Sequence, residues 1–327
     1  MEQQHKVSIC MITYNHEKYI REAIEGVLMQ ECDFEIELII ANDCSTDKTD
    51  DVIQNIVENH PKASWVKYIK QKENLGMMPN FIFAMQQCKG EYIALCEGDD
   101  YWTDPLKLQK QVDFLDANTD YVLCFHQVNV LKNNCEIVDD FITKVPENYE
   151  TIETLARLGN YIQTPSVVFR NIIKEFPFEF SYSPIGDYFL YMMLAEYGKL
   201  KYLEDKMCVY REGVGVWSDK SIYFRNFNTA LVHAYLVEYF SGKESQRISG
   251  ILHERIRSFI NNFESQISKE DMINLSSNVL IRTSIFDLLL TNLVQLKNGS
   301  IDKKKTRELI QIIFRRVKKG IWKKLGL

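Results

Sequence analysis

The sharpest polar cluster is Glu97-Gly98-Asp99-Asp100, directly after the apolar run EYIALC. In an extended segment side chains alternate, so Glu97 and Asp99 point the same way, and Gly98 leaves room for a ligand to approach the backbone. Carboxylates this close repel one another unless a cation lies among them. Oxygen ligands suit Mg²⁺ or Mn²⁺, which bridge readily to phosphates. The alternative is a solvated acidic turn before a helix that Asp104 caps.

Two further polar segments follow apolar runs that we interpret as strands. Thr13, Tyr14 and Asn15 follow residues 7–12, and Asn42, Asp43, Ser45, Thr46 and Asp47 follow residues 35–41. Parallel sheets bind ligands outside the carboxyl ends of their strands, so all three segments should converge on one rim. Asx, Ser and Thr residues also favour turns and helix caps for local reasons, and Ser45, Thr46 or Asp47 suits the cap of the next helix. Asp43 is less needed as a cap and could accept a hydrogen bond from a base imide or a ribose hydroxyl.

The motifs that mark several other classes of enzyme are absent from the sequence. The sequence contains no GxxxxGK[ST] pattern, no GxGxxG after a strand and no HExxH; Gly213 and Gly215 form only a lone GxG. These absences disfavour ATPases, dinucleotide oxidoreductases and zinc hydrolases.

The polar segments lie in an alternation of strand-like and helical patterns. Strand patterns cover 7–12, 35–41, 65–69, 91–96 and 121–130, and helical ones cover 17–30, 80–88, 104–118 and a stripe on Val52, Ile53, Ile56 and Val57. Such an alternation predicts an α/β fold with a mostly parallel sheet and helices on both faces. A strand at 166–170, a helix at 187–197 and a strand at 207–211 extend it, and only helical patterns follow Ser218. We therefore expect a domain over residues 1–218 and an all-helical region over 219–327.

Composition favours a cytoplasmic globular protein. The 327 residues allow a sizeable core, and no apolar stretch reaches the roughly 20 residues of a membrane span. Residues 1–6 are polar and 7–12 are too short for a signal-peptide core. None of the eight cysteines forms a CxxC pair, which favours reduced thiols over a zinc site or disulfides.

Charge is distributed unevenly. Residues 303–327 carry ten Lys/Arg against Glu308 alone, a net +9, and the rest of the chain sums to −15. The acidic body argues against nucleic acid binding. An apolar stripe (Leu309, Ile310, Ile313, Phe314, Val317, Ile321 and Leu325) opposes the basic residues. This pattern is typical of an interfacial membrane helix, and a helix packed on protein is the alternative.

The combined pattern resembles the family 2 glycosyltransferases, which have the Rossmann-like GT-A fold. VSICMITYNHEKYIREAIEGVLMQ is similar to that family's opening strand, turn and helix, and LIIANDCSTDKT to its VDDGSTDGT stretch. KENLGMMPN followed by KGEYIALCEGDDYW is similar to its later NxG and DxDD stretch, with Glu97 in place of the leading aspartate. The motifs occur in the family's order over roughly residues 7–215.

The resemblance implies a nucleotide-sugar donor, UDP- or dTDP-linked, and a divalent cofactor. Nucleotide contacts would come from Thr13, Tyr14, Asn15, Asp43, Asn74, Gly76, Glu97 and Arg211, and metal contacts from Asp99, with Asp100 nearby. The acceptor would be a glycan or a lipid-linked glycan of a cell-surface polysaccharide or glycolipid.

The resemblance also implies a catalytic base. Gly186-Asp187 matches the family's later acidic motif, so Asp187 would deprotonate the acceptor hydroxyl in an inverting reaction. A helix N-terminus favours the charged carboxylate and weakens a base, whereas desolvation by Tyr182, Tyr188 and Phe189 would strengthen it. A plain N-cap is the alternative.

Two departures leave other functions open. Many relatives carry a His where this chain has Gly213, which leaves the third metal ligand unassigned. Relatives also often carry an Arg just before the residue that matches Asn80, where this chain has Pro79. A non-catalytic nucleotide-sugar-binding protein on this fold is therefore one alternative. A nucleotidyltransferase is another, although its usual Gly-rich basic loop is missing from residues 13–18.

Overall fold

The computed structural model of the chain describes residues 5–133, 135–215, 222–241 and 245–263. The chain divides into two compact units, Met1–Lys220 and Ser221–Leu327, each of which is described by itself. The basic segment 303–327 and the helical region expected from residue 264 onward lie outside the described residues. The helical C-terminal domain therefore remains a proposal.

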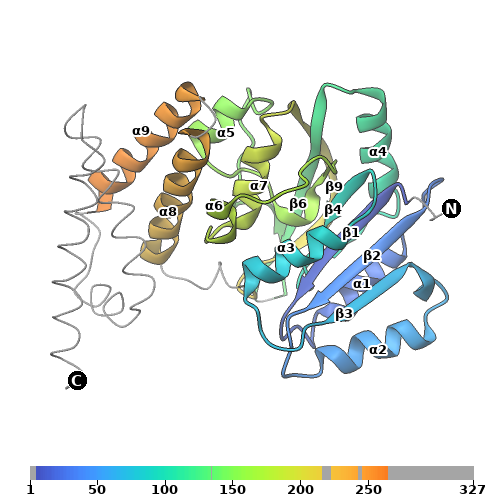
Figure 1. The fold of residues 1–327 in the computed structure, drawn as a ribbon. Helices are drawn as coiled ribbons and strands as arrows, with labels where there is room; N and C mark the ends of the chain where they lie inside the picture. Colours follow the sequence, from blue (N-terminus) through green and yellow to red (C-terminus); the bar gives the residue numbers. More distant parts are fainter. Residues whose placement is uncertain (1–4, 134, 216–221, 242–244, 264–327) are drawn as a thin grey trace, which may run out of the picture. The chain divides into compact units, whose positions relative to one another are not determined.

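One sheet of nine strands organises the described part of the first unit, in the order β3-β2-β1-β4-β8-β6-β9-β5 with β7 paired to β6 (Figure 1). The strands are β1 Val7–Thr13, β2 Ile36–Asn42, β3 Val66–Lys70, β4 Tyr92–Leu95, β5 Tyr101–Trp102, β6 Tyr121–Leu131, β7 Ile137–Asp139, β8 Val168–Arg170 and β9 Lys199–Arg211. Strands β1 to β4 pair in parallel. Beyond β4 the sheet is mixed, because β8 runs antiparallel to both β4 and β6. The predicted α/β class is confirmed, but the sheet is mostly parallel only in its first half.

Helices cover both faces of this sheet. They are α1 Ile20–Leu28, α2 Thr49–Asn59, α3 Met77–Gln87, α4 Lys107–Ala117, α5 Ile152–Leu158, α6 Phe178–Ser181 and α7 Gly186–Leu194, with 3₁₀ turns at Ala63–Trp65 and Thr164–Ser166. Alternate residues of β1 (Val7, Ile9, Met11) join α1, α2 and α4 in one buried core. Helices α3, α6 and α7 lie on the opposite face (Figure 1). Period-two alternation thus lets the buried strand β1 pack on both sides.

Helix starts differ from the predicted ones for local reasons. Helix α3 begins at Met77, before Pro79, because proline is tolerated in a first turn and Gly76 supplies a left-handed residue (φ 87°) in front of it. Helix α4 begins at Lys107 instead of near Asp104, whose carboxylate accepts the Leu106 N–H at 2.8 Å.

The cap expected for α2 also differs. Lys48 precedes this helix without a side-chain cap, and Ser45 Oγ donates to Asn42 Oδ1 instead. The Asp47 carboxylate accepts the Thr49 N–H at 3.0 Å, so Asp47 supports the first turn from just outside it.

In the second unit the described helices are α8 (Ile222–Ser241) and α9 (Gln246–Phe263), which pack on each other. Among the described residues, no helix is both long enough and apolar enough to span a bilayer. All eight cysteines are free thiols, and Cys10, Cys88, Cys96, Cys124 and Cys208 are buried.

Candidate functional site

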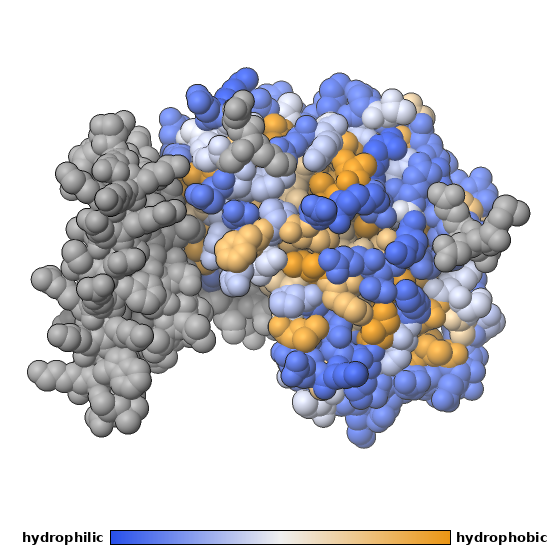
Figure 2. Space-filling view, in the orientation of Figure 1, coloured by the Kyte–Doolittle hydropathy of each residue, from blue (hydrophilic) through white to orange (hydrophobic). Residues whose placement is uncertain are grey.

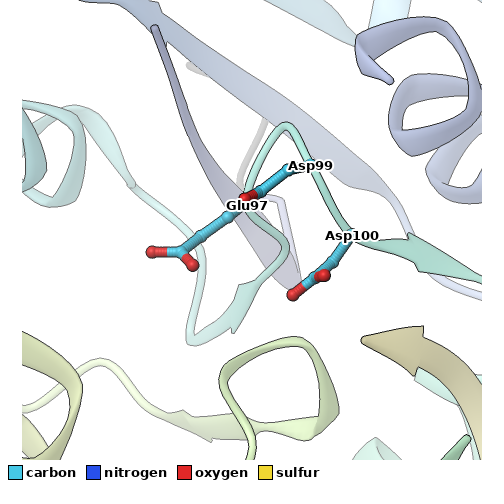
Figure 3. A group of neighbouring side chains, drawn as sticks. All are labelled: Glu97, Asp99 and Asp100. Atoms are coloured by element: carbon cyan, nitrogen blue, oxygen red, sulfur yellow. The ribbon is translucent and has the colours of Figure 1, made fainter. Parts of the chain in front are cut away.

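The acidic turn between β4 and β5 is the centre of the site. The carboxylates of Glu97, Asp99 and Asp100 offer ligand oxygens that all lie within 4.8 Å of one another, and all three side chains project from this one turn (Figure 3). Asp99 and Asp100 are buried, whereas Glu97 is half-buried. The turn therefore concentrates negative charge in a place from which water is largely excluded.

Burial and mutual repulsion raise the pKa values of two carboxyl groups in this turn. Burial, followed by the charges of Asp99 and Asp187, raises the pKa of Glu97 to about 8. Burial and the charge of Asp99 hold the pKa of Asp100 well above its ordinary value. A bound cation would remove both penalties, because it favours the ionised carboxylates.

One oxygen of this turn is unpartnered. Asp100 is 1% exposed; its Oδ1 accepts the Arg211 N–H at 2.8 Å, but Oδ2 has no hydrogen-bond partner among the described residues. Buried polar atoms are nearly always paired, and an orphan calls for an explanation such as an ion. Three clustered carboxylates with an orphaned oxygen fit a divalent cation with oxygen ligands.

Arg211 secures the turn from β9. Its guanidinium donates to the Asp99 carbonyl and to the Glu22 carboxylate, and it lies over the rings of Tyr19 and Tyr101 at 5.1 and 4.5 Å. The side chain is buried. These contacts hold the Arg211 guanidinium against the acidic turn, and its contact with the nucleotide stays a prediction.

The end of β1 joins the acidic turn to the second polar segment. The Gly98 N–H donates to the Ile12 carbonyl at 3.0 Å, and the Asp43 N–H donates to the Thr13 carbonyl at 2.9 Å. The structure thus brings Asp43 and the acidic turn to the same end of the sheet.

Gly98 has a different role from the one expected. A Cβ there would lie 2.7 Å from Thr13 Oγ1 and 3.0 Å from His16 Nδ1. Protein side chains, not a ligand, occupy the space that this glycine leaves.

The Asp43 carboxylate holds the loop before α3. Its two oxygens accept the N–H groups of Leu75 at 2.7 Å and Gly76 at 3.0 Å, and Asn74 Nδ2 donates to the Asp43 carbonyl at 3.2 Å. Asp43 therefore forms one cluster with Asn74 and Gly76, which follow it by 31 and 33 residues.

Asn15 links two loops. It adopts a left-handed conformation (φ 57°), and its side-chain Oδ1 accepts the Thr46 N–H at 2.8 Å. Its own N–H donates to Ser45 Oγ at 2.9 Å. Tyr14 beside it is exposed, and Thr13 is buried, so Tyr14 offers its ring at the surface of this rim.

Asp187 lies in the first turn of α7 with three hydrogen-bond donors. Oδ2 accepts from Asn160 Nδ2 at 2.9 Å and Thr164 Oγ1 at 3.3 Å, and Oδ1 accepts the Tyr188 N–H at 2.7 Å. Burial nevertheless raises the pKa of Asp187, although these donors oppose the shift. Desolvation thus outweighs the helix N-terminus. The charge of Asp187 in turn contributes to the raised pKa of Glu97, after burial and the charge of Asp99.

Two residues at this site were missed by the sequence analysis. Tyr191 follows Asp187 by one helical turn; its hydroxyl is buried, and Thr164 is the neighbour that acts on it by hydrogen bonding. The charges of Asp187 and Glu97, after burial, hold its pKa well above the ordinary range. The i, i+4 spacing from Asp187 was an available signal. The second residue is His16, whose Nε2 lies 3.9 Å from Asp99 Oδ2.

Comparison with known families decides the assignment. The model of "Glycosyl transferase family 2" matches residues 8–176. The chain belongs to this family. An uncharacterised protein of Mycobacterium tuberculosis is 38% identical over 212 residues, which is 64% of this chain and 60% of that protein. The chain thus spans about 60% of the length of this relative. An uncharacterised glycosyltransferase of Nostoc is 27% identical over 85% of this chain and 81% of its own length.

Solved structures of low identity share the fold of this family 2 member. TarS of S. aureus, in complex with UDP-GlcNAc, has a TM-score of 0.59 at 18% identity and covers 89% of this chain and 81% of the TarS chain. The mannosyltransferase PcManGT of Pyrobaculum calidifontis, in complex with GDP-Man and Mn²⁺, has a TM-score of 0.53 at 16% identity and covers 91% of this chain and 88% of its own. The GT-A fold expected from the sequence is therefore confirmed.

Proposed function

We propose that this family 2 member transfers a sugar from a UDP- or dTDP-sugar to an acceptor hydroxyl with inversion at the anomeric carbon. The observation that carries the proposal is the meeting of three segments: Asp43 and the acidic turn both bond to the end of β1, and the Asp187 charge acts on Glu97. On this proposal a nucleotide pocket, a cation site and a base would lie within reach of one substrate.

Donor binding would use the rim formed by the ends of β1 and β2. The exposed Tyr14 ring can stack on a pyrimidine base, and the cluster of Asp43, Asn74 and Gly76 can meet its imide or the ribose. Each carboxylate oxygen has capacity for a second hydrogen bond, so the N–H groups that already bind Asp43 do not block this role. Glu97 would lie next to the ribose and the metal.

Asp99 and Asp100 would hold the divalent ion, Mg²⁺ or Mn²⁺. When bound, the ion stabilises negative charge on the departing diphosphate. Asp100 contributes the orphaned Oδ2, and Arg211 keeps the turn in place through the Asp99 carbonyl and the Asp100 carboxylate.

Asp187 would act as the base. The acceptor oxygen forms a bond to the anomeric carbon while the bond to the diphosphate oxygen breaks, and the hydroxyl proton passes to an Asp187 oxygen. A raised pKa makes the carboxylate a stronger proton acceptor. One displacement with one base inverts the anomeric configuration.

The test is a donor panel in Mn²⁺ and in EDTA. Thermal shift with UDP, dTDP and GDP should identify a stabilising nucleotide, because ligands that bind only the folded state raise its apparent stability. Release of that nucleoside diphosphate from its sugar should require the ion and be lost in Asp187→Asn. Release of pyrophosphate from a nucleoside triphosphate supplied with a sugar 1-phosphate would instead indicate a nucleotidyltransferase. Nucleotide binding without any sugar release, in the presence of acceptor glycans, would indicate a non-catalytic binding protein.

The acceptor is proposed to be lipid-linked, in cell-surface polysaccharide or glycolipid synthesis at the inner face of the membrane. The support is the basic amphipathic pattern of residues 303–327, with net charge +9. Deleting these residues should move the protein from the membrane fraction to the supernatant, and an unchanged distribution would refute membrane contact.

A further inference from the structure

His16 lies in the loop after β1 and faces the acidic turn. Its backbone is fixed, since the His16 N–H donates to Thr49 Oγ1 at 2.8 Å. The side chain is 19% exposed, and Nε2 is 3.9 Å from Asp99 Oδ2. Among the described residues, this is the histidine that pairs with the turn.

The distance of 3.9 Å between Nε2 and Asp99 Oδ2 has a chemical meaning. It is too long for a direct hydrogen bond, because the distance between donor nitrogen and acceptor oxygen in such a bond rarely exceeds about 3.2 Å. Two ligands on opposite sides of an ion, each held at about 2.1 Å, lie about 4 Å apart. The gap therefore has the span of one ion between two of its ligands.

The other ring nitrogen of His16 is already engaged. Nδ1 lies 3.2 Å from Thr13 Oγ1, and the Gly98 backbone packs against both side chains. In the tautomer that donates Nδ1–H to Thr13, the Nε2 lone pair faces Asp99. Metal-binding histidines are commonly held by such a bond from the second nitrogen.

The loop after β9 does not offer an imidazole to this ion. Position 213, where many relatives carry a histidine, is a glycine with φ 80°. Residues other than glycine rarely adopt this backbone conformation. Gly215 approaches instead, so closely that a Cβ there would lie 3.2 Å from Asp99 Oδ2. A backbone segment without a side chain thus lies against Asp99 Oδ2.

We propose that His16 Nε2 is a ligand of the divalent ion held by Asp99 and Asp100, in place of the histidine absent at position 213. This inference rests on the proposed function, from which the ion comes. It assigns the nitrogen ligand to the loop after β1, so one loop serves both the nucleotide and the metal.

The test is pulsed electron paramagnetic resonance on the full chain with Mn²⁺, alone and with UDP. The wild-type protein should show ¹⁴N modulation from a directly bound imidazole, which changes to the ¹⁵N pattern after labelling with ¹⁵N-histidine. His16→Gln should lose the modulation and weaken Mn²⁺ binding in calorimetry by roughly tenfold or more. His60→Gln, a change at the end of α2, is the matched control and should leave both unchanged.

Two failures are distinguishable. If Mn²⁺ binds but the wild-type protein shows no ¹⁴N coupling, His16 is not a ligand and the proposed function still stands. If Mn²⁺ does not bind even with UDP, both proposals are wrong. The isotope experiment needs no substitution, so a wild-type spectrum without histidine coupling overturns the proposal even if His16→Gln does not fold.

Discussion

Thr164 donates its hydroxyl to Oδ2 of Asp187 across 3.3 Å, from the 3₁₀ turn before β8 to the first turn of α7. Because a hydrogen bond to the ionised form lowers a carboxyl pKa, this contact restrains the upward shift that burial imposes on Asp187. The segment between α5 and β8 therefore tunes the proposed base.

Replacing Thr164 by Val should raise the pKa of Asp187 further. The acidic limb of the kcat–pH profile should then move to higher pH, and the rate on that limb should fall about fivefold, which corresponds to about 1 kcal/mol for one hydrogen bond. Steady-state rates measured across the limb provide the test. A limb that stays in place or moves to lower pH would show that Thr164 does not act on the ionisation of the base.

Asp187→Asn should remove transfer while leaving donor binding intact. The loss of a general base typically lowers kcat by about 10²–10⁴-fold, and Asn keeps the size and much of the hydrogen bonding. Initial rates and nucleotide Kd values should be measured together. A parallel loss of nucleotide affinity would place Asp187 in the donor pocket and argue against its role as the base.

Asp100→Asn should separate metal binding from folding. The wild-type Tm should rise on addition of Mn²⁺ and fall again in EDTA, because the ion relieves repulsion among buried carboxylates. The variant should be more stable than the wild type in EDTA, since it buries one ionisable group fewer, and should gain little from Mn²⁺. Equal Mn²⁺-induced shifts in both proteins would show that Asp100 does not bind the ion.

Gly98→Ala should destabilise the protein by about 1–3 kcal/mol through overpacking. The new methyl group would lie 2.7 Å from Thr13 Oγ1 and press on His16. Gly250→Ala is the control, because a Cβ at that position in α9 meets nothing within 4 Å. It should be neutral or stabilising by up to about 1 kcal/mol, as expected for alanine in a helix. Denaturant unfolding of both variants gives the comparison.

The buried Lys107 should make the free energy of unfolding depend on pH independently of the candidate site. Burial lowers the pKa of this lysine to about 8, and Nζ contacts Gln111 and lies 4.1 Å above the Trp102 ring. Between about pH 8 and the ordinary lysine pKa of 10.5, Lys107 is protonated in the unfolded chain but neutral in the folded protein. The free energy of unfolding of the wild type should therefore rise with pH relative to Lys107→Met, by about 3 kcal/mol at most over this window. A constant difference between the two proteins would contradict the shift.

Much of the first half of the fold could be predicted because its strands are continuous apolar runs. The buried parallel strands β1, β2 and β4 are of this kind, and their carboxyl ends carry the polar segments of the site. Strands β5, β7 and most of β9 were missed, because β5 has two residues and β7 has three, too few to show a period. The exposed part of β9 alternates poorly.

The supporting residues of the site were beyond the reach of sequence patterns. Asn160 and Thr164 meet Asp187 only after α5 and α7 have packed, and His16 meets Asp99 only across the sheet rim. None of these pairs has a local spacing that signals contact. Phe178 of α6 and Tyr182 directly after it stay exposed, at 70% and 58%, and Figure 2 shows hydrophobic residues scattered among polar ones in this region.

The link from Arg211 to the acidic turn also bears on the order of assembly during translation. Arg211 follows Asp99 by 112 residues, so the ribosome completes the carboxylates long before it adds the strand that supplies their buried N–H donor. Until then the turn has a surplus of negative charge and no cationic anchor. A nascent chain halted before β9 would carry every proposed nucleotide contact except Arg211 and would still lack the donors that hold the acidic turn, so the proposed cation site should form only after Arg211 has emerged.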